Sequence, residues 1–598
     1  MHNRRVIILL KKSVALCCLY LCLCLFASSV QAGASLHIPR AKNPPLLRDY
    51  LQAVPPDAGV PVSDFKQRAP GDGTPASQST TAYLSFDDTH FYVVFVAKDE
   101  PSLIRARLAK RENFEGDDFV ILELDTFHDQ RRAFTFSVNP YGVQLDAKRT
   151  EGLDLDMSFE TQWQSDGIIT ADGYVALMAI PFKSLRFKHA DVQTWGVAVG
   201  RVIARLNEES FWPVITKRLA GFVPQMASVT IPEKLTAGRN AQINPFVYLG
   251  KSRILNNDDK SQPYWKDESK LQAGLDAKWV LGDATAIDLT FKPDFSEVES
   301  DEPQIIIDKR YEVLFPEKRP FFLENAGFFQ TPKPLFFSRR IREPTAGLRL
   351  TGREAAWSFG GLLIDDQAPG NTDADAASAG KRAHIAMARV QNDVSKEANL
   401  GVIVTDRRFD GDRNTVFGID GRVQLDKNWS LQAQLARSQS MQIGQAVRKG
   451  TLAESERQGQ LRHIELKHEG KHLEYEAEYL DVTPHFDTRL AFLPRTDVRQ
   501  VQQHAKYEWQ LEGRPWLQTV GLIGNAEVSR DQQNRRQDWV ANVGFLSVAA
   551  RSTWLVSLVE KSYEKYQGQD FYKRAWIASV GSNWWDQFGF VLDTVVGD

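Results

Sequence analysis

The sequence predicts an all-β chain, with an N-terminal β-sandwich followed by a transmembrane antiparallel β-barrel. Two observations support this fold class. Short β-branched and aromatic runs, separated by turn residues such as Asn139-Pro140, occupy the region from residue 81 to about 232. Beyond residue 240 the runs are longer and alternate between apolar and polar residues, as expected for strands with one apolar and one polar face.

The first 32 residues have the features of an export signal. Basic residues precede an apolar stretch over residues 13–26, and Val30-Gln31-Ala32 offers the small residues that signal peptidase requires. A membrane anchor is the alternative, but the short stretch and its small-residue ending favour cleavage. All 4 cysteines lie inside this stretch, so the mature chain is expected to contain no disulfide or thiolate metal site.

Composition changes along the mature chain divide it into three regions. Residues 33–80 are rich in Pro, Gly, Ser and Asp, and are expected to form an extended segment with little core of its own. The sandwich is expected over residues 81–235 and the barrel over 240–598. The formal net charge of −3 argues against a nucleic-acid partner, which would favour a basic excess.

The alternation after residue 240 has two readings. Leu473, Tyr475, Ala477 and Tyr479 alternate with glutamates, which puts the two sets on opposite faces of a strand. A soluble sheet with one face in water would have the same alternating sequence pattern. Polar irregular segments between the strands and aromatic residues near strand ends favour a barrel whose apolar face contacts outer-membrane lipid. No apolar run after residue 32 is long enough for a spanning helix.

Several separate segments of the chain are similar to segments of one family. They are Ser63–Ala76, Asn139–Gln144, Ile180–Phe187, Asn207–Pro213, Lys292–Glu299, Phe315–Asn325 and Leu335–Ile341. Together they resemble exported bacterial proteins in which a domain similar to family 9 carbohydrate-binding modules precedes a large outer-membrane β-barrel of unknown function. The resemblance implies location in the outer membrane of a Gram-negative bacterium. It also implies a polysaccharide or oligosaccharide ligand, bound by the sandwich or passed through the barrel.

The C-terminus departs from that resemblance. Outer-membrane barrels usually end in a strand that closes on an aromatic residue, whereas this chain ends Val595-Val-Gly-Asp598. We therefore expect either that the last strands are missing from the sequence or that the barrel closes in an unusual way.

Sugar binding needs aromatic faces and planar polar side chains, often with calcium bracing the loops. Trp163, in a polar stretch, is the candidate platform, and Tyr141 is a second candidate ligand-binding residue. Asp117, Asp118 and Asp125 are candidate calcium ligands, and the first two are also candidate ligand-binding residues. The alternative is that these carboxylates bond to backbone amides or to nearby arginines.

The sequence leans against an enzyme. A hydrolase of O-glycosyl bonds in carbohydrate catabolism remains the rival, because Glu123 and Asp125 share a strand face and could form an acid/base pair. A purely structural outer-membrane role is a further alternative. His463 and His468 cannot ligate one metal from a single strand, because they point to opposite faces.

Residues 295–345 interrupt the alternation with prolines, aromatics and charges. Backbone outside the strand ladder is tolerated at membrane depth only where protein or lumen water surrounds it. One hypothesis is therefore an inward plug or gate; the other is an ordinary periplasmic or extracellular loop. The candidate gate residues are Glu317, Lys318, Arg319, Arg339 and Arg340. In the plug hypothesis, Arg339, Arg340 and Arg342 pair with lumen carboxylates.

Overall fold

The structure is a computed structural model. It describes residues 36–597 except 52–53, 56, 114–115, 158, 189, 237–240, 257–263, 282–283, 294–311, 372–377, 443–454, 512–513, 515, 567 and 586–587. The expected export signal lies outside the described residues. In the part described, strands form three sheets, which confirms the prediction of an all-β chain with a large antiparallel sheet. None of the helices described is both long and apolar enough to cross a bilayer.

The N-terminal body is a sandwich of an eight-stranded and a five-stranded sheet. The larger sheet contains β1 (Leu36–His37), β13 (Ala227–Ile231), β11 (Gln193–Ile203), β6 (Phe119–Asp125), β7 (Arg132–Val138) and β8 (Gln144–Thr150). In addition, β12 (Glu208–Trp212) pairs with β11, and β3 (Lys66–Ala69) pairs with β12. The smaller contains β2 (Val60–Val62), β4 (Thr80–Phe86), β5 (His90–Lys98), β10 (Gly173–Pro181) and β9 (Gln164–Thr170). Short helices η1 (Leu47–Tyr50), η2 (Pro101–Leu103), η3 (Phe182–Ser184), η4 (Ala204–Leu206) and η5 (Val223–Gln225) connect them.

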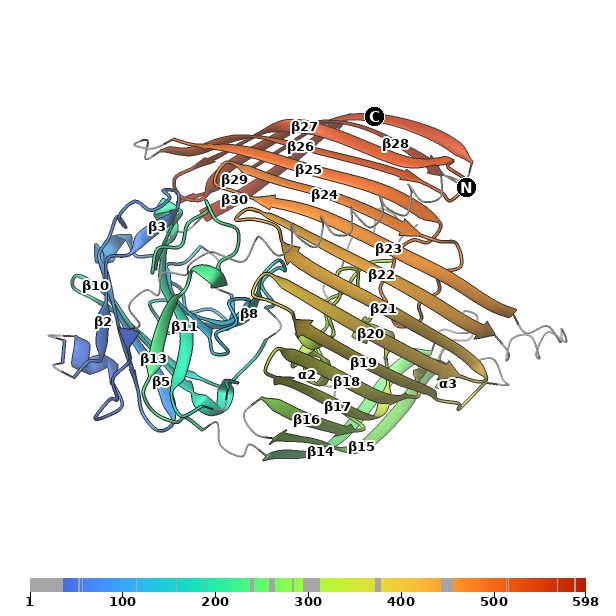
Figure 1. The fold of residues 1–598 in the computed structure, drawn as a ribbon, viewed down its shortest axis with the longest axis horizontal. Helices are drawn as coiled ribbons and strands as arrows, with labels where there is room; N and C mark the ends of the chain where they lie inside the picture. Colours follow the sequence, from blue (N-terminus) through green and yellow to red (C-terminus); the bar gives the residue numbers. More distant parts are fainter. Residues whose placement is uncertain are drawn as a thin grey trace, which may run out of the picture.

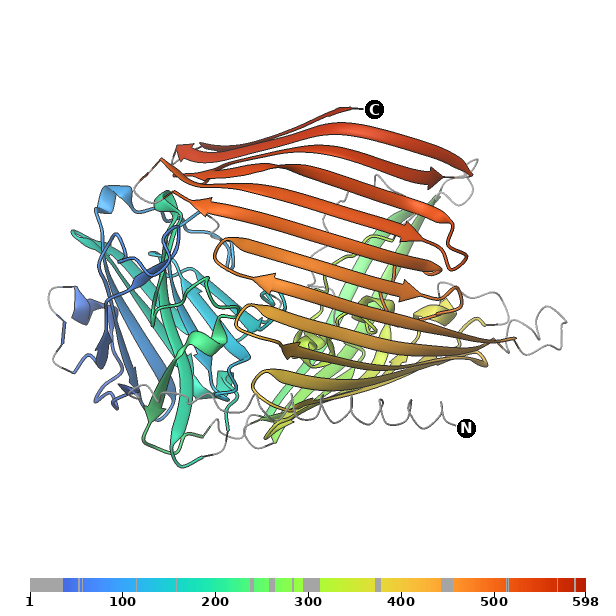
Figure 2. The same cartoon turned by 45° about the horizontal axis from the view of Figure 1, so that its top comes forward.

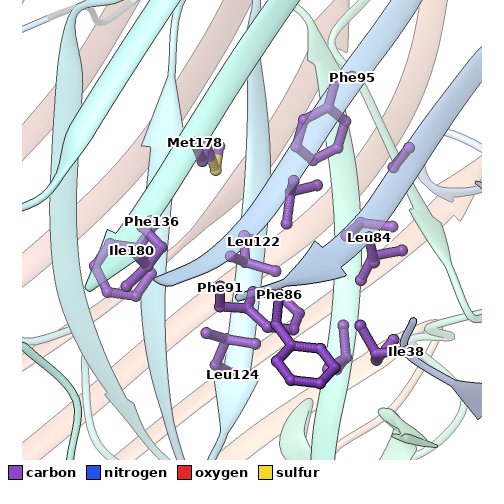
Figure 3. Close-up of a cluster of buried hydrophobic side chains, with 14 of the residues drawn as sticks. Ile38, Leu84, Phe86, Phe91, Phe95, Leu122, Leu124, Phe136, Met178 and Ile180 are labelled. Atoms are coloured by element: carbon purple, nitrogen blue, oxygen red, sulfur yellow. The ribbon is translucent and has the colours of Figure 1, made fainter. Parts of the chain in front are cut away.

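One hydrophobic core lies between the two sheets. Figure 3 shows Phe91 and Phe95 of β5 facing Leu122 and Leu124 of β6, and all four side chains are fully buried. Alternate residues of each strand point inward, so the β-branched and aromatic runs of the sequence supply this core.

Residues 36–80 belong to the sandwich, which corrects the expectation of a separate extended segment. β1 pairs in parallel with β13, and β2 pairs with β4. Ile38, Val62 and Phe65 are buried in the sandwich core. Proline and glycine interrupt this stretch often enough to mask its short strands, but a few well-placed apolar side chains suffice to anchor it.

The C-terminal body is a 17-stranded antiparallel sheet in which each described strand pairs with the next along the chain. Its strands are β14 (Ala241–Asn256), β15 (Tyr264–Leu281), β16 (Thr285–Phe291), β17 (Pro344–Glu354), β18 (Trp357–Asp366), β19 (Ala383–Asp393), β20 (Ala398–Phe409), β21 (Asp412–Gln424), β22 (Trp429–Gln442), β23 (Ser455–Glu469), β24 (Leu473–Val482), β25 (Val498–Gln510), β26 (Leu517–Arg530), β27 (Arg536–Ala549), β28 (Thr553–Tyr566), β29 (Gln569–Trp585) and β30 (Phe588–Gly597). The sheet curls around an interior (Figures 1 and 2). Among the described residues, β14 and β30 are not paired with each other.

The polarity of this sheet is inverted relative to a soluble protein. On the outer face, Val390, Val402, Ile419 and Leu435 lie side by side in register on four neighbouring strands and are 37–51% exposed. On the inner face of the same strands, charged and amide side chains are buried, among them Arg389, Asp420 and Gln434. Along these four strands, exposed apolar positions alternate with enclosed positions, many of them polar, as in a wall with lipid outside and a polar lumen inside.

The two ends of the sheet differ in the lengths of their connections. Turns 355–356, 394–397, 425–428, 470–472 and 550–552 lie at one end and have two to four residues each. The long connections 292–343, 367–382, 443–454 and 483–497 join strands at the other end and have 12 to 52 residues, counted between strand bounds. That end also has the short turns 410–411 and 531–535. The sandwich covers the opposite end (Figure 1).

Candidate functional site

The described part of the expected plug folds inward, against the concave face of the sheet. These residues, 312–343, are called the inserted segment below. It contains α2 (Pro320–Leu323), η6 (Ala326–Phe329) and η7 (Ser338–Arg340). Phe322, Phe329, Leu335 and Ile341 are buried in a cluster with apolar side chains from β18 to β25. This packing disagrees with an ordinary surface loop. Residues 294–311 of the expected plug lie outside the described residues.

Two wall glycines allow this close approach. A Cβ on Gly360 of β18 would lie 2.6 Å from the ring of Phe329, and a Cβ on Gly418 of β21 would lie 2.6 Å from Leu335. Any larger residue there would displace the inserted segment. Glycine inside a strand often marks such an approach.

The candidate gate residues mainly stabilise the inserted segment itself. Glu317 accepts hydrogen bonds from the Arg319 guanidinium and from the Ser338 hydroxyl at 2.6 Å, and from the Lys318 amide at 3.0 Å. Arg339 donates to the Pro316 carbonyl. Arg340 pairs with Glu312 of the same segment at 2.5 Å, rather than with a carboxylate on the wall, which corrects the expected pairing.

A second inward segment was missed by sequence reasoning. Residues 483–497, between β24 and β25, bury Phe486 and Leu490 in the same cluster as the inserted segment. The Phe337 amide donates to the Leu490 carbonyl at 2.6 Å, so the two segments contact each other directly. Its aromatic and leucine content among polar residues was the available signal.

The sandwich is held to the sheet by polar contacts at the short turns. Arg131 pairs with Asp393 at 3.1 Å and also donates to the carbonyls of Ser395 and Lys396 in the next turn. Farther along the sheet, the Asn207 side chain donates to Gln518 at 2.8 Å. The two bodies therefore enclose the space between them.

A cavity of about 190 Å³ lies where the sandwich, the inserted segment and the inner sheet face meet. Its walls include Phe134 of β7 in the sandwich, Phe328 of η6 in the inserted segment and Gln432 of β22 in the sheet. Its lining contains eight basic side chains against four acidic ones. The basic side chains are Arg131, Arg132, Lys148, Arg149, Arg186, Arg353, Arg389 and Arg422.

Half of these cations are already neutralised by carboxylates. Besides the Arg131 pair, Arg149 pairs with Glu123 at 2.7 Å, Arg353 with Asp393 at 2.8 Å and Arg389 with Asp420 at 2.6 Å.

The other four have no ion-pair partner anywhere in the described chain. They are Arg132, Lys148, Arg186 and Arg422, and each is partly buried. Arg132 donates to the Ser358 hydroxyl at 3.2 Å. Nη1 of Arg186 is buried and makes no hydrogen bond. Uncompensated charge away from water is unfavourable, so the cavity has an electrostatic preference for an anion.

Lys148 responds to this surplus of positive charge. Burial, and then the nearby Arg186, lowers the pKa of Lys148 to about 7. Its Nζ lies 4.3 Å from the centre of the Phe159 ring, a cation–π contact. An anion in the cavity would restore the protonated form of this side chain.

The sandwich residues expected to bind sugar are arranged differently from the prediction. Trp163 is only 7% exposed and packs edge-on to Phe136 in the core, at 5.2 Å between ring centres, which corrects its assignment as a platform. It lies just before β9, between Gln162 and Gln164. Tyr141 is 45% exposed.

The expected calcium ligands do not converge. Asp117 pairs with Arg107 at 2.8 Å, while Asp118 accepts a hydrogen bond from the Ala204 amide at 2.8 Å. Asp125 accepts the amide of Gln130 at 2.8 Å. Burial raises the pKa of Asp118 to about 6. The pKa of Asp125 is raised to about 7 by burial and by the neighbouring Asp129. The alternative of structural carboxylates fits these contacts.

The carboxylate pair behind the hydrolase rival is also buried. Glu123 is fully enclosed, bonded to Arg149 and to the Thr135 hydroxyl at 2.8 Å. Another group of carboxylates in the sandwich does lie close together: Glu112, Asp146 and Glu160. Burial and the neighbouring Glu160 raise the pKa of Glu112 to about 8.

Comparisons with known proteins give one partial family match. A family model described as a domain of unknown function (DUF5916) matches residues 245–354, from β14 to β17 with the inserted segment between them. No curated protein matches the chain.

Among solved structures, the chain is similar to crystal structures of three Pseudomonas aeruginosa proteins. OccK11 (OpdR) is 10% identical with a TM-score of 0.29, over 80% of this chain and 95% of that one. OccK9 (OpdG) is 12% identical with a TM-score of 0.28, over 80% and 97%. OpdK, determined with vanillate, is 9% identical with a TM-score of 0.27, over 80% and 97%.

Proposed function

We propose that this chain is an outer-membrane protein that binds a small organic anion between its sandwich and its lumen, and passes it through the lumen. The inverted polarity of the 17-stranded sheet supports the membrane location. In outer-membrane barrels the short turns face the periplasm, so the sandwich lies on the periplasmic side. The inserted segment narrows the lumen and acts as its gate.

The proposal of an anionic ligand rests on one observation: four cations without carboxylate partners among the described residues surround one cavity. Guanidinium groups bind carboxylates and phosphates through paired hydrogen bonds, which suits Arg132 and Arg186. Phe134 and Phe328 add apolar surface to the cavity beside these cations. Engineered apolar cavities of roughly 150 Å³ hold a benzene ring, which sets the size scale.

Arg186→Gln and Arg132→Gln are each expected to weaken binding of citrate about 10-fold or more. Each removes a charge-assisted hydrogen bond, which contributes about 1.5–3 kcal/mol. The measurement is isothermal titration calorimetry on the full chain in detergent, with citrate, inorganic phosphate and glucose as probes. A preference for citrate over phosphate identifies a carboxylate ligand, and the reverse identifies a phosphorylated one.

Two controls sharpen this test. Arg413→Gln removes an exposed arginine that pairs with Asp406 at the far end of β21, and should leave binding unchanged. Because Lys148 is charged only below a pH of about 7, anion affinity should fall as pH rises through 7, and Lys148→Met should remove that dependence. Equal binding of citrate by wild type and both cavity variants would refute the anion site.

We also infer a second candidate function, glycan binding by the sandwich, from a groove on its smaller sheet. The groove has a volume of about 710 Å³, and its lining includes the polar side chains of His90, Gln162 and Gln164 beside the aromatic rings of Trp163 and Phe182. Planar polar groups are those that recognise sugar hydroxyls. The resemblance to carbohydrate-binding modules supports the same role.

Gln164→Ala is expected to abolish retention of the full chain on a glycan panel, because it removes an amide from the groove. Tyr141→Ala, outside the groove lining, is the matched comparison. Loss of retention in Tyr141→Ala but not in Gln164→Ala would place the sugar site at Tyr141 instead of the groove. No retention of the wild-type chain by any glycan would end this second candidate.

A further inference from the structure

Three potential metal ligands meet on the inner face of β23 and β24. His463 and Glu465 lie two residues apart on β23, so their side chains share a face. Glu478 of β24 is the direct cross-strand partner of Glu465. His463 is 1% exposed and Glu478 is 8% exposed, so the group is enclosed by the wall and the inserted segment.

The distances suit one small cation. His463 Nε2 lies 3.5 Å from Glu478 Oε1 and 3.9 Å from Glu465 Oε2. One ligand atom from each residue falls within 4.8 Å of the others. Zinc–nitrogen and zinc–oxygen bonds of about 2.0–2.2 Å in a tetrahedron separate neighbouring ligand atoms by roughly 3.4 Å. Small side-chain rotations would bring all three to that spacing.

His463 supplies an independent observation. In the described structure neither of its ring nitrogens makes a hydrogen bond, although both are buried. A buried polar group without a partner costs about 1–3 kcal/mol, and most such groups in proteins are satisfied. A metal bound at Nε2 would satisfy the nitrogen that faces the two glutamates.

Lys333 of the inserted segment reaches the same site. Its Nζ lies 2.5 Å from Glu478 Oε1. Its backbone amide donates to the Gln434 side chain at 2.6 Å, and its carbonyl accepts from that amide group at 3.1 Å. Gln434 is the cross-strand partner of His463, so the lysine is fixed beside the imidazole.

We propose that His463, Glu465 and Glu478 bind a divalent transition metal, zinc in particular, and that the metal competes with Lys333 for Glu478. Imidazole with two carboxylates is a donor set that zinc accepts. Two carboxylates balance a dication, whereas a dication beside the retained ammonium leaves one positive charge uncompensated in a buried site. Metal binding therefore releases one anchor of the inserted segment from the wall.

The experiment measures zinc in the full chain purified in detergent, treated with chelator and dialysed against zinc chloride. Wild type should retain one zinc per chain by mass spectrometry. His463→Ala and Glu478→Gln should lower zinc affinity roughly 100-fold, since even groups that only support ligands contribute 10–100-fold. Lys333→Met should raise affinity, because it removes the competing cation. Cobalt substitution should give the visible spectrum of a site with an imidazole ligand.

His468→Ala is the matched control, because His468 lies on the same strand, packs against Trp429 and faces away from the site. It should bind zinc as wild type does. Unchanged zinc content in both His463→Ala and Glu478→Gln would overturn the site, and unchanged affinity in Lys333→Met would overturn the competition. Metal content is read directly, so this result is independent of anion binding in the cavity.

Discussion

Replacing Asp99 by alanine is expected to lower the unfolding free energy of the sandwich by about 3–5 kcal/mol. The Asp99 carboxylate forms ion pairs with the guanidinium groups of Arg201 at 2.8 Å and Arg205 at 2.7 Å. The side chains of Asp99 and Arg201 are fully buried. Without the carboxylate, Arg201 would remain as an uncompensated charge between the sheets. Breaking a buried pair from one side is costly because the other charge cannot return to water.

The measurement is chemical unfolding of the full chain, followed by tryptophan fluorescence, to which buried Trp195 contributes. Asp172→Ala is the matched control. Asp172 forms an exposed ion pair with Lys98, the residue before Asp99, so its replacement should change the unfolding free energy little. Similar unfolding midpoints for Asp99→Ala and wild type would contradict the assigned role of this pair.

Replacing Ile419 by arginine is expected to destabilise the membrane-inserted sheet by about 2–4 kcal/mol. Ile419 lies in the middle of β21 within the exposed apolar row, where we propose contact with the hydrocarbon core. A charge at that depth must leave water without a partner. The measurement is urea unfolding of the chain reconstituted in lipid vesicles.

Leu425→Arg provides the comparison at the end of the same strand. Leu425 is also exposed, but it lies at the short turn, where the cost of a charge falls to about 0–1 kcal/mol. The difference between the two variants therefore reports depth in the bilayer. Equal effects of both substitutions, or recovery of the wild-type chain as a water-soluble monomer, would exclude the lipid-facing sheet.

Periodicity predicted the fold better than the site. The alternation in β24 is local, so two faces could be assigned from sequence alone. Trp163 lies just before β9, outside the strand, so the same rule could not show that its ring packs on Phe136 in the core. The calcium ligands were predicted from closeness in sequence, whereas the carboxylates have separate partners, such as the amide 86 residues away that donates to Oδ1 of Asp118.

The cavity and the proposed zinc site could not be read from the sequence. Arg132, Arg186 and Arg422 meet only because the sandwich docks on the sheet and the inserted segment folds between them. No local pattern encodes that docking. For His463, strand geometry correctly separated it from His468, but its cross-strand partner on β24 depends on register, which a single strand does not reveal.

The unequal connection lengths also bear on how such a chain would assemble. The sandwich is synthesised first and is too large to thread the lumen it covers, so it would stay on the side from which the strands enter. Only the tips of the hairpins would then travel across the bilayer. Most of the chain carried across belongs to 292–343, 367–382 and 483–497, and the first and last of these return into the interior, where Phe337 contacts Leu490. Ordering of that interior would follow strand insertion.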